Sequence, residues 1–279
     1  MRMAHKTFRI GVVQPHPVST SYEDFRNGGD VDHACELLSR FEGQADLVCF
    51  PEMYPWTGEK ELGQSARALG IGLVAGIVEQ TPTGCYNTAT LFGRDGSIIG
   101  RQRKKYPTAG EIERAGISAG KSYEVFDVEQ VRIGMVICAD LPFFTDWRAL
   151  IDQKADVIFN LSRWFALSDA YPATIISRHL EFGRPFIGLN WARFAFPQWD
   201  QVPHGFPPAG GHTTITIPPS VTNLKELGHW FRTKQGGIDS MKDFATVLGE
   251  EEETATVTID IDAVRRFPGY FYYEPQRIQ

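Results

Sequence analysis

The sequence predicts an α/β fold in which helices pack against a mixed β-sheet. Short apolar runs typical of buried strands alternate along the chain with segments that have the apolar spacing of amphipathic helices. Some neighbouring strand-like segments are separated only by turn residues, which indicates β-hairpins. Of the 279 residues, 42% are hydrophobic and 22% are charged, a composition that can build a substantial buried core. A layered sandwich is the simplest packing for these elements.

The predicted strands end at turn residues or at prolines. The first ends at Pro15, and the second, which is mostly apolar, ends at Pro51. Arg94-Asp95-Gly96 is the expected turn of a hairpin. The predicted strands cover residues 8–14, 46–50, 71–78, 86–92, 97–101, 123–128, 132–137, 156–161, 186–190, 213–217 and 254–261.

Helices are predicted where apolar residues recur every three or four positions between capping signals. Asp30 is the expected N-cap of the first helix, which runs to Phe41 and stops at Gly43. The Thr145 hydroxyl is the expected cap of the third helix, and Gly183 closes the fourth. The predicted helices cover residues 31–41, 58–69, 145–153 and 172–181.

The whole chain, residues 1–279, is predicted to form one domain. No stretch is rich enough in proline, glycine or serine to act as a linker, and no internal repeat is present. Residues 194–211 contain four prolines and three glycines, and they predict an ordered loop beside the functional site.

Charge and cysteine usage exclude several classes of function. A net charge of −6 argues against nucleic-acid binding. No apolar stretch approaches the roughly 20 residues of a membrane span, and no signal peptide is visible. The four cysteines (Cys35, Cys49, Cys85 and Cys138) lack metal-like spacing and predict no disulfide framework, which favours a reducing cytoplasm.

Three predicted strands are followed by a residue that can take part in chemistry. These residues are Glu52, Lys104 and Cys138. Because functional sites in open α/β sheets gather where strands end, we expect the three side chains to converge.

The three residue types together are suited to nucleophilic catalysis. A thiol attacks as thiolate, and Cys138 is expected at a strand-to-helix turn whose backbone N–H groups favour the anion. Glu52 can accept the thiol proton, pass it to a leaving amine and then activate water. Lys104 can stabilise a tetrahedral oxyanion together with a backbone N–H near residue 139. The expected intermediate is a thioester on Cys138.

Each residue taken singly also has an ordinary structural explanation. Cys138 could be a small core residue, Glu52 a carboxylate at a helix start, and Lys104 one of a solvated basic cluster. Other catalytic patterns are missing from the sequence, because no histidine stands in a recognisable context and no Gly-x-Ser-x-Gly, His-Glu-x-x-His or Cys-x-x-Cys motif occurs. The ordered trio is therefore the best candidate.

With these residues in this order, the chain resembles the nitrilase superfamily, the carbon–nitrogen hydrolases with a Glu-Lys-Cys triad. Residues 45–52 resemble the segment with the family's glutamate, and residues 86–100 the hairpin before its lysine. The Arg-Lys pair 103–104 makes Lys104 the matching lysine. Residues 134–140 resemble the nucleophile segment, and residues 155–164 the strand that follows it. The resemblance covers most of the chain.

The resemblance has implications for architecture and partners. It implies a four-layer α-β-β-α sandwich with mixed sheets, no metal or organic cofactor, and a homodimer or larger homo-oligomer. It also implies a second glutamate after the lysine, for which Glu111 is the choice and Glu113 the alternative. Residues 219–250 are longer than the turn expected there, and an interface or a lid is the hypothesis for them.

The substrate is predicted from the residues around the trio. Asp140 after Cys138 resembles the amidase branches, whereas Tyr106-Pro107 after the lysine leans toward the nitrile-cleaving branch. Asp140 carries more weight because it lies nearer to the thiol. The predicted reaction is therefore hydrolysis of a linear, non-peptide amide or N-carbamoyl compound, with release of ammonia or an amine. The alternatives are a nitrilase, which converts a nitrile to a carboxylic acid and ammonia, and a non-catalytic assembly protein on the same fold.

Four further side chains are candidates for the substrate pocket. Trp56, Phe143 and Trp164 are aromatic residues near its expected mouth, although core packing is an equal alternative for each. Arg163 could bind a substrate carboxylate through two hydrogen bonds, or pair with one of the protein's own acids.

Overall fold

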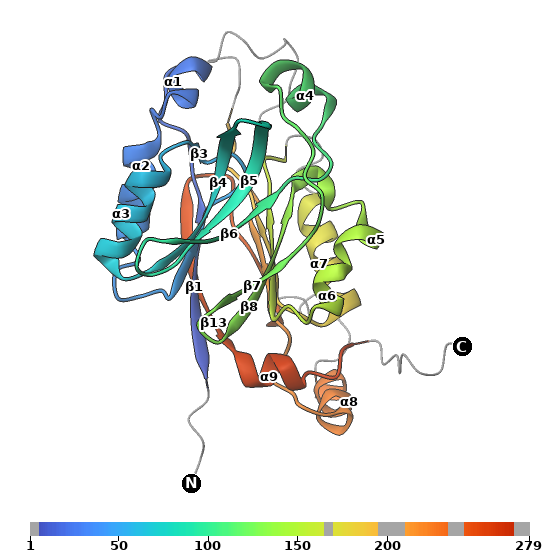
Figure 1. The fold of residues 1–279 in the computed structure, drawn as a ribbon. Helices are drawn as coiled ribbons and strands as arrows, with labels where there is room; N and C mark the ends of the chain where they lie inside the picture. Colours follow the sequence, from blue (N-terminus) through green and yellow to red (C-terminus); the bar gives the residue numbers. More distant parts are fainter. Residues whose placement is uncertain (1–5, 165–169, 195–209, 234–242, 271–279) are drawn as a thin grey trace.

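The computed structural model describes residues 6–164, 170–194, 210–233 and 243–270. Two β-sheets pack face to face, and helices cover the outer face of each (Figure 1). Both sheets contain parallel and antiparallel pairs. The predicted four-layer α-β-β-α sandwich with mixed sheets is confirmed.

The first sheet has the strand order β13-β1-β2-β4-β5-β6, and β3 also pairs with β4. The β1–β2 and β2–β4 pairs are parallel, because helices connect these strands. β5 and β6 form the predicted antiparallel hairpin. The bounds are β1 Thr7–Gln14, β2 Leu47–Cys49, β3 Pro55–Trp56, β4 Gly72–Thr81, β5 Gly84–Phe92, β6 Ile98–Arg103 and β13 Glu253–Asp260.

The second sheet has the strand order β12-β11-β10-β9-β8-β7. β8, β9 and β10 run parallel, and β7–β8 is the second predicted hairpin. The bounds are β7 Val125–Val128, β8 Val131–Ile137, β9 Val157–Leu161, β10 Phe186–Leu189, β11 Thr214–Thr216 and β12 Ala245–Val247.

The helices lie outside the two sheets or at their ends (Figure 1). α2 and α3 cover the first sheet, and α5, α6 and α7 cover the second (Figure 1). The bounds are α1 Tyr22–Arg26, α2 Val31–Ser39, α3 Glu59–Leu69, α4 Ala109–Ala115, α5 Phe144–Trp147, α6 Ala149–Asp152, α7 Ala170–Phe182, α8 Leu224–Thr233 and α9 Ile261–Arg266.

Three apolar clusters hold the four layers together. The inner faces of the sheets meet in one cluster, where Val12 and Leu91 of the first sheet join Ile137 and Leu161 of the second. A second cluster lies between the first sheet and α2 and α3, and a third between the second sheet and α5–α7. Burial of these alternating faces fixes the register of the strands, so the strand ends that carry the candidate site are fixed too.

The two capping predictions had different outcomes. Asp30 is the N-cap residue of α2, as predicted, but its carboxylate accepts hydrogen bonds from the backbone N–H groups of Val18 (3.1 Å) and Ser19 (2.8 Å) and makes no cap hydrogen bond to the helix. The prediction for Thr145 was wrong. The predicted helix 145–153 is divided into α5 and α6, and Thr145 lies inside α5, whose N-cap is Phe143.

The two long segments singled out in the sequence are only partly described. Within residues 194–211, positions 195–209 lie outside the described residues. Within residues 219–250, the structure describes α8 and β12, and β12 extends the second sheet beside β11. The lid or interface hypothesis for this segment stays a prediction.

Gly76 in β4 holds the turn that carries Glu52. A Cβ atom at this position would lie 2.3 Å from the backbone nitrogen of Met53 and 2.3 Å from the carbonyl oxygen of Pro51. We expect Gly76→Ala to push the turn outward and to lower the free energy of unfolding by about 1–3 kcal/mol. Urea unfolding measures this loss.

The matched control is Gly228→Ala in α8, where an added Cβ meets only the Arg232 guanidinium at 3.4 Å. This substitution is expected to raise the free energy of unfolding by up to about 1 kcal/mol, because glycine is unfavourable inside a helix. Equal stability of the two variants would contradict the close packing of the turn on β4.

Candidate active site

Three strand ends bring a carboxylate, an ammonium and a thiol together at one end of the sandwich. Glu52 follows β2, Lys104 follows β6, and Cys138 follows β8 of the other sheet. Lys104 Nζ donates a hydrogen bond to Glu52 Oε1 at 2.6 Å. The charges of Glu52, Lys104 and Glu111 all act on the pKa of the Cys138 thiol, so the sulfur lies within the same buried cluster. The expected convergence is therefore observed.

Lys104 is the central cation of the cluster. Its side chain is only 1% exposed, and Nζ donates to both Glu52 and Glu111, the latter at 2.8 Å. Burial alone would lower the pKa of this ammonium, but the facing carboxylates outweigh burial and raise it. Lys104 is therefore protonated, and two of its three N–H groups are directed at carboxylates.

Glu111, and not Glu113, contacts the lysine. Thr108 caps α4, and Glu111 completes a capping box by accepting a hydrogen bond from the Thr108 backbone N–H at 2.7 Å. Burial acts to raise the pKa of Glu111, but the charge and hydrogen bond of Lys104 hold it below its ordinary value. Glu113 lies on the exposed side of α4. The first turn of α4 thus fixes an ionised carboxylate beside Lys104.

Cys138 lies at a sharp turn between β8 and a single 3₁₀ turn, Cys138–Asp140. Its φ of 41° is in the left-handed region, which is uncommon for a residue other than glycine. Burial, and then the charge of Glu52, raise the pKa of its thiol, whereas the charge of Lys104 lowers it. The expectation that the following helix favours the anion is wrong for this state, since the following element is only one turn long and the thiol is protonated.

Glu52 is held from several sides by residues that the sequence reasoning missed. Asn87 Nδ2 donates to Glu52 Oε1 at 2.8 Å, and the Arg163 backbone N–H donates to Oε2 at 2.8 Å. The Trp191 indole N–H donates to the backbone oxygen of Glu52 at 2.8 Å. Asn87 had a signal in the sequence, because this residue stands in the predicted hairpin that leads to Lys104. Trp191 had none.

Asp140 links the lysine strand to the nucleophile turn. Its carboxylate accepts hydrogen bonds from the backbone N–H groups of Tyr106 (2.7 Å), Lys105 (3.3 Å) and Ile137 (3.4 Å). Burial raises the pKa of Asp140 to about 6, although these donors act in the opposite direction. This carboxylate therefore holds the backbone and is not directed at a substrate.

The raised pKa of Asp140 predicts a pH-dependent stability. Its folded-state pKa of about 6 exceeds the ordinary aspartate value of 3.8, so the folded protein loses stability as pH rises from 4 through 6. The difference corresponds to about 3 kcal/mol. We expect Asp140→Asn to remove this component, so that urea unfolding at pH 4.5 and pH 7.5 gives a smaller pH dependence in the variant than in the wild type.

The control for this experiment is Asp127→Asn, whose side chain is 77% exposed on the second sheet. That variant is expected to keep the pH dependence of the wild type. An unchanged pH dependence in Asp140→Asn would contradict the assignment of a raised pKa to Asp140.

The predicted pocket residues occupy different environments. Trp56 is 5% exposed and packs in the core against Tyr22 and Phe25. Phe143 is 45% exposed and stacks on Tyr106, with ring centroids 3.9 Å apart. The Trp164 ring lies 5.4 Å from that of Tyr171, and the Trp164 backbone N–H donates to Asn190.

Arg163 is the predicted pocket residue nearest to the trio. Its backbone holds Glu52, and its guanidinium lies 5.2 Å from the centre of the Trp191 ring. Burial lowers the pKa of Arg163, against the opposing charges of Glu52, Glu111 and Cys138. The guanidinium therefore contributes positive charge to the same cluster as Lys104.

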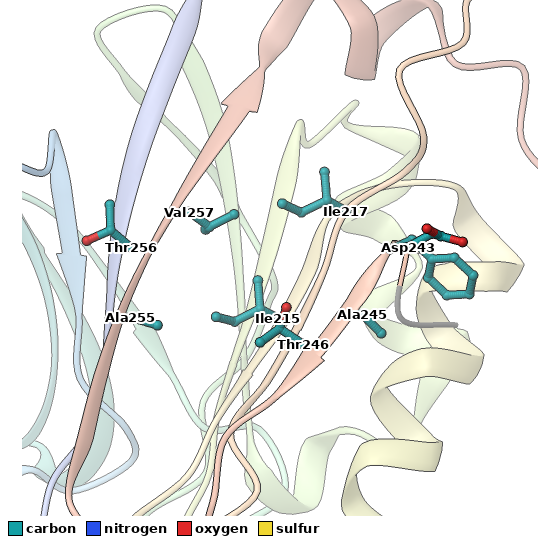
Figure 2. Close-up of a pocket in the computed structure, with 9 residues that line it drawn as sticks. Ile215, Ile217, Asp243, Ala245, Thr246, Ala255, Thr256 and Val257 are labelled. Atoms are coloured by element: carbon teal, nitrogen blue, oxygen red, sulfur yellow. The ribbon is translucent and has the colours of Figure 1, made fainter. Parts of the chain in front are cut away.

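The structure also contains a cavity of about 170 Å³ (Figure 2). It is lined by the ends of β11 and β12 and by residues 255–257 of β13, so it sits where one edge of each sheet comes together. Its lining is mostly apolar and includes neither Glu52, Lys104 nor Cys138. The cavity is distinct from the candidate active site.

The described part of the chain has neither a metal-binding cluster nor a membrane-spanning helix. No group of three or more histidine, cysteine, aspartate or glutamate side chains is arranged to hold a metal ion there. Among the same residues, no helix combines the length and the apolar character that a bilayer crossing requires.

Curated relatives match about half of the chain. Omega-amidase NIT2 from Xenopus tropicalis is 31% identical over 163 residues, which are 49% of this chain and 56% of that protein. Omega-amidase NIT2 from Mus musculus is 28% identical over 162 residues, with the same coverage. A probable hydrolase, YhcX, from Bacillus subtilis is 42% identical over 164 residues, which are 50% of this chain and 31% of that protein. The chain thus spans about half the length of the omega-amidases it matches.

Solved structures and a family model match over a longer range. Nit3 from Saccharomyces cerevisiae, a member of branch 10 of the nitrilase superfamily, is 18% identical with a TM-score of 0.75, covering 98% of this chain and 97% of that one. An amidase from Nesterenkonia sp. AN1 in the nitrilase superfamily is 17% identical with a TM-score of 0.68, covering 92% and 93%. The carbon-nitrogen hydrolase family model matches residues 9–268. Because that match covers nearly the whole chain, the protein belongs to the carbon–nitrogen hydrolase family.

Proposed function

We propose that this protein hydrolyses the carbon–nitrogen bond of a linear, non-peptide amide or N-carbamoyl compound. The observation that carries the proposal is the buried cluster in which Lys104 contacts Glu52 and Glu111, with the Cys138 thiol close enough for their charges to act on its pKa. A thiol beside a carboxylate base and a fixed cation has the parts that acyl transfer requires.

In the first half-reaction Cys138 Sγ forms a bond to the carbonyl carbon, and the thiol proton passes to Glu52. The raised pKa of Cys138 means that the proton leaves as the bond forms, so a base must be close by, and Glu52 is the carboxylate whose charge acts most strongly on the thiol. Lys104 has two N–H groups on carboxylates, and its third stabilises the oxyanion. Glu52 then protonates the nitrogen, the C–N bond breaks, and ammonia or an amine leaves.

The second half-reaction returns the enzyme to its starting state. Glu52 takes a proton from water, and the oxygen attacks the thioester carbon. The C–S bond breaks, the thiolate recovers its proton from Glu52, and the acid is released. Glu111 keeps Lys104 charged and in place through both steps.

Two sets of residues would bind the substrate. The Arg163 guanidinium would pair with an acidic group of the substrate, since it lies in the charge field of the trio. Phe143 and Trp164, which are only partly buried, would contact its apolar part, and Trp56 would support the wall from the core. The omega-amidase relatives support an amide as the substrate.

We also propose that residues 1–279 form a single domain that assembles as a homodimer or larger homo-oligomer in the cytoplasm. The single family match over residues 9–268 supports one domain. The four cysteines are all free thiols, which supports a reducing compartment. Light scattering of the purified protein tests the assembly.

Ammonia release from matched panels of aliphatic amides, N-carbamoyl amino acids and nitriles tests the proposed function. We expect turnover of amides or N-carbamoyl compounds, and loss of at least about a thousandfold in kcat in Cys138→Ala. Cys85→Ala, which removes another free, partly exposed thiol, is the control and is expected to retain activity. Turnover of nitriles alone would favour the nitrilase alternative, and full activity of Cys138→Ala would exclude the thiol mechanism.

A further inference from the structure

Asn87 is the one neutral side chain that contacts both carboxylates of the cluster in the described structure. Its Nδ2 lies 2.8 Å from Glu52 Oε1 and 2.7 Å from Glu111 Oε1. The residue is 1% exposed on β5, and its backbone carbonyl oxygen accepts a hydrogen bond from the backbone N–H of Lys104 at 2.8 Å. Asn87 therefore touches the base, the second glutamate and the lysine strand at once.

The chemistry of the amide determines its orientation. An NH₂ group carries two hydrogens, which allows it to serve two carboxylates, whereas the amide oxygen would be repelled by both. The Oδ1 atom has no hydrogen-bond partner among the described residues. Leaving Oδ1 buried without a partner costs free energy. The two hydrogen bonds that Nδ2 donates to the carboxylates must therefore contribute more than that cost.

The donors divide the two oxygens of Glu52 into different roles. Oε1 accepts hydrogen bonds from Lys104 and from Asn87, whereas Oε2 accepts one, from the Arg163 backbone N–H. Since Oε1 is occupied by two donors, Oε2 is the oxygen with acceptor capacity left for a proton. The thiol proton of Cys138 would therefore pass to Oε2.

A neutral donor is suited to this place for an electrostatic reason. A further cation in direct contact with Glu52, in addition to Lys104 and the nearby charge of Arg163, would stabilise its charged form strongly and weaken it as a base. A third carboxylate would add repulsion to a cluster that already has two acids for one lysine. An amide orients the carboxylates without either effect.

We propose that Asn87 is a positioning residue that holds Glu52 so that Oε2 is its proton-accepting oxygen, with Glu111 fixed by the same amide. The proposal rests on the proposed thiol hydrolysis. It assigns to Asn87 no contact with substrate, and its effect is therefore expected in kcat and in the pH profile rather than in KM.

Two substitutions test the proposal by kinetics. Asn87→Ser can donate only one hydrogen bond, so we expect kcat to fall by about tenfold to a hundredfold, KM to change by less than about threefold, and the acid limb of kcat/KM to move to higher pH. Asn87→Asp adds a third acid, so the acid limb is expected to move up by about one pH unit or more.

Thr90→Val is the matched control, because it also replaces a buried polar group on β5 but on the other face of the strand. We expect its kinetics and its acid limb to equal those of the wild type. Loss of kcat in both Asn87 variants without movement of the acid limb would mean a merely structural role and would overturn the proposal, as would wild-type kinetics in both.

A crystal structure of Asn87→Ser provides a readout that does not depend on turnover. We expect the Glu52 carboxylate to rotate so that Oε1 and Oε2 no longer keep their separate contacts with Lys104 and the Arg163 backbone. An unmoved Glu52 carboxylate would overturn the proposal. If the wild type hydrolyses no amide or carbamoyl compound, the proposed function fails, and this structure still decides the role of Asn87.

Discussion

Lys104→Met is expected to abolish turnover and to remove a large part of the folding stability. The substitution keeps an unbranched side chain one atom shorter, but it leaves Glu52 and Glu111 in a buried site without their cation. Removing one partner of a buried ion pair costs about 3–5 kcal/mol. We expect kcat to fall at least about a thousandfold, because the oxyanion also loses its charged donor. Urea unfolding and ammonia release measure the two effects.

A second variant separates loss of folding from loss of chemistry. In Lys104→Met/Glu111→Gln one of the two carboxylates is neutral, so part of the stability is expected to return while turnover stays absent. Lys105→Met is the matched control, since that neighbouring ammonium is 29% exposed and pairs with Asp146. It is expected to change stability by less than about 1 kcal/mol. Retention of a tenth of wild-type turnover by Lys104→Met would refute its role.

The fold was predictable because burial leaves a plain pattern in the sequence. Strand β2 is apolar along its whole length and β9 at every position except Asn160, as expected for strands covered on both faces, and both were predicted. The layer order confirmed these predictions. Short elements were missed, such as β3 with two residues and α1 with five, because they are too short for a helical or strand period to repeat.

The convergence of Glu52, Lys104 and Cys138 was predicted from chemistry, since each follows a strand. The sequence could also have decided between Glu111 and Glu113 as the second glutamate. Thr108-x-x-Glu111 is a capping-box pattern, which places Glu111 in the first turn of a helix and Glu113 on its exposed side.

Other parts of the site depend on contacts between distant segments and left no pattern. Trp191 is 139 positions from Glu52, the residue whose backbone oxygen it holds. Asp140 was predicted to mark the amidase branch by its place after Cys138, but its carboxylate bonds backbone groups 34 and 35 positions away. A residue type alone does not tell whether its carboxylate faces the substrate or the backbone.

Glu52→Gln is expected to change turnover and thiol reactivity in opposite directions. The amide cannot accept the thiol proton, so kcat/KM is expected to fall by about a hundredfold to ten-thousandfold. The charge of Glu52 raises the pKa of the Cys138 thiol, whereas that of Lys104 lowers it. Without the carboxylate the thiol pKa falls, more thiolate is present at a given pH, and alkylation of Cys138 by iodoacetamide becomes faster.

Peptide mapping after timed alkylation between pH 6 and pH 10 follows Cys138 separately from Cys35 and Cys85. Glu113→Gln is the matched control, because it removes an exposed carboxylate from α4 and is expected to change neither turnover nor the alkylation profile. If alkylation of Cys138 in Glu52→Gln slows together with turnover, the carboxylate does not set the proton affinity of the thiol. Faster alkylation by an enzyme that no longer turns over requires that Glu52 is both the neighbour that keeps the sulfur protonated and the group that removes its proton.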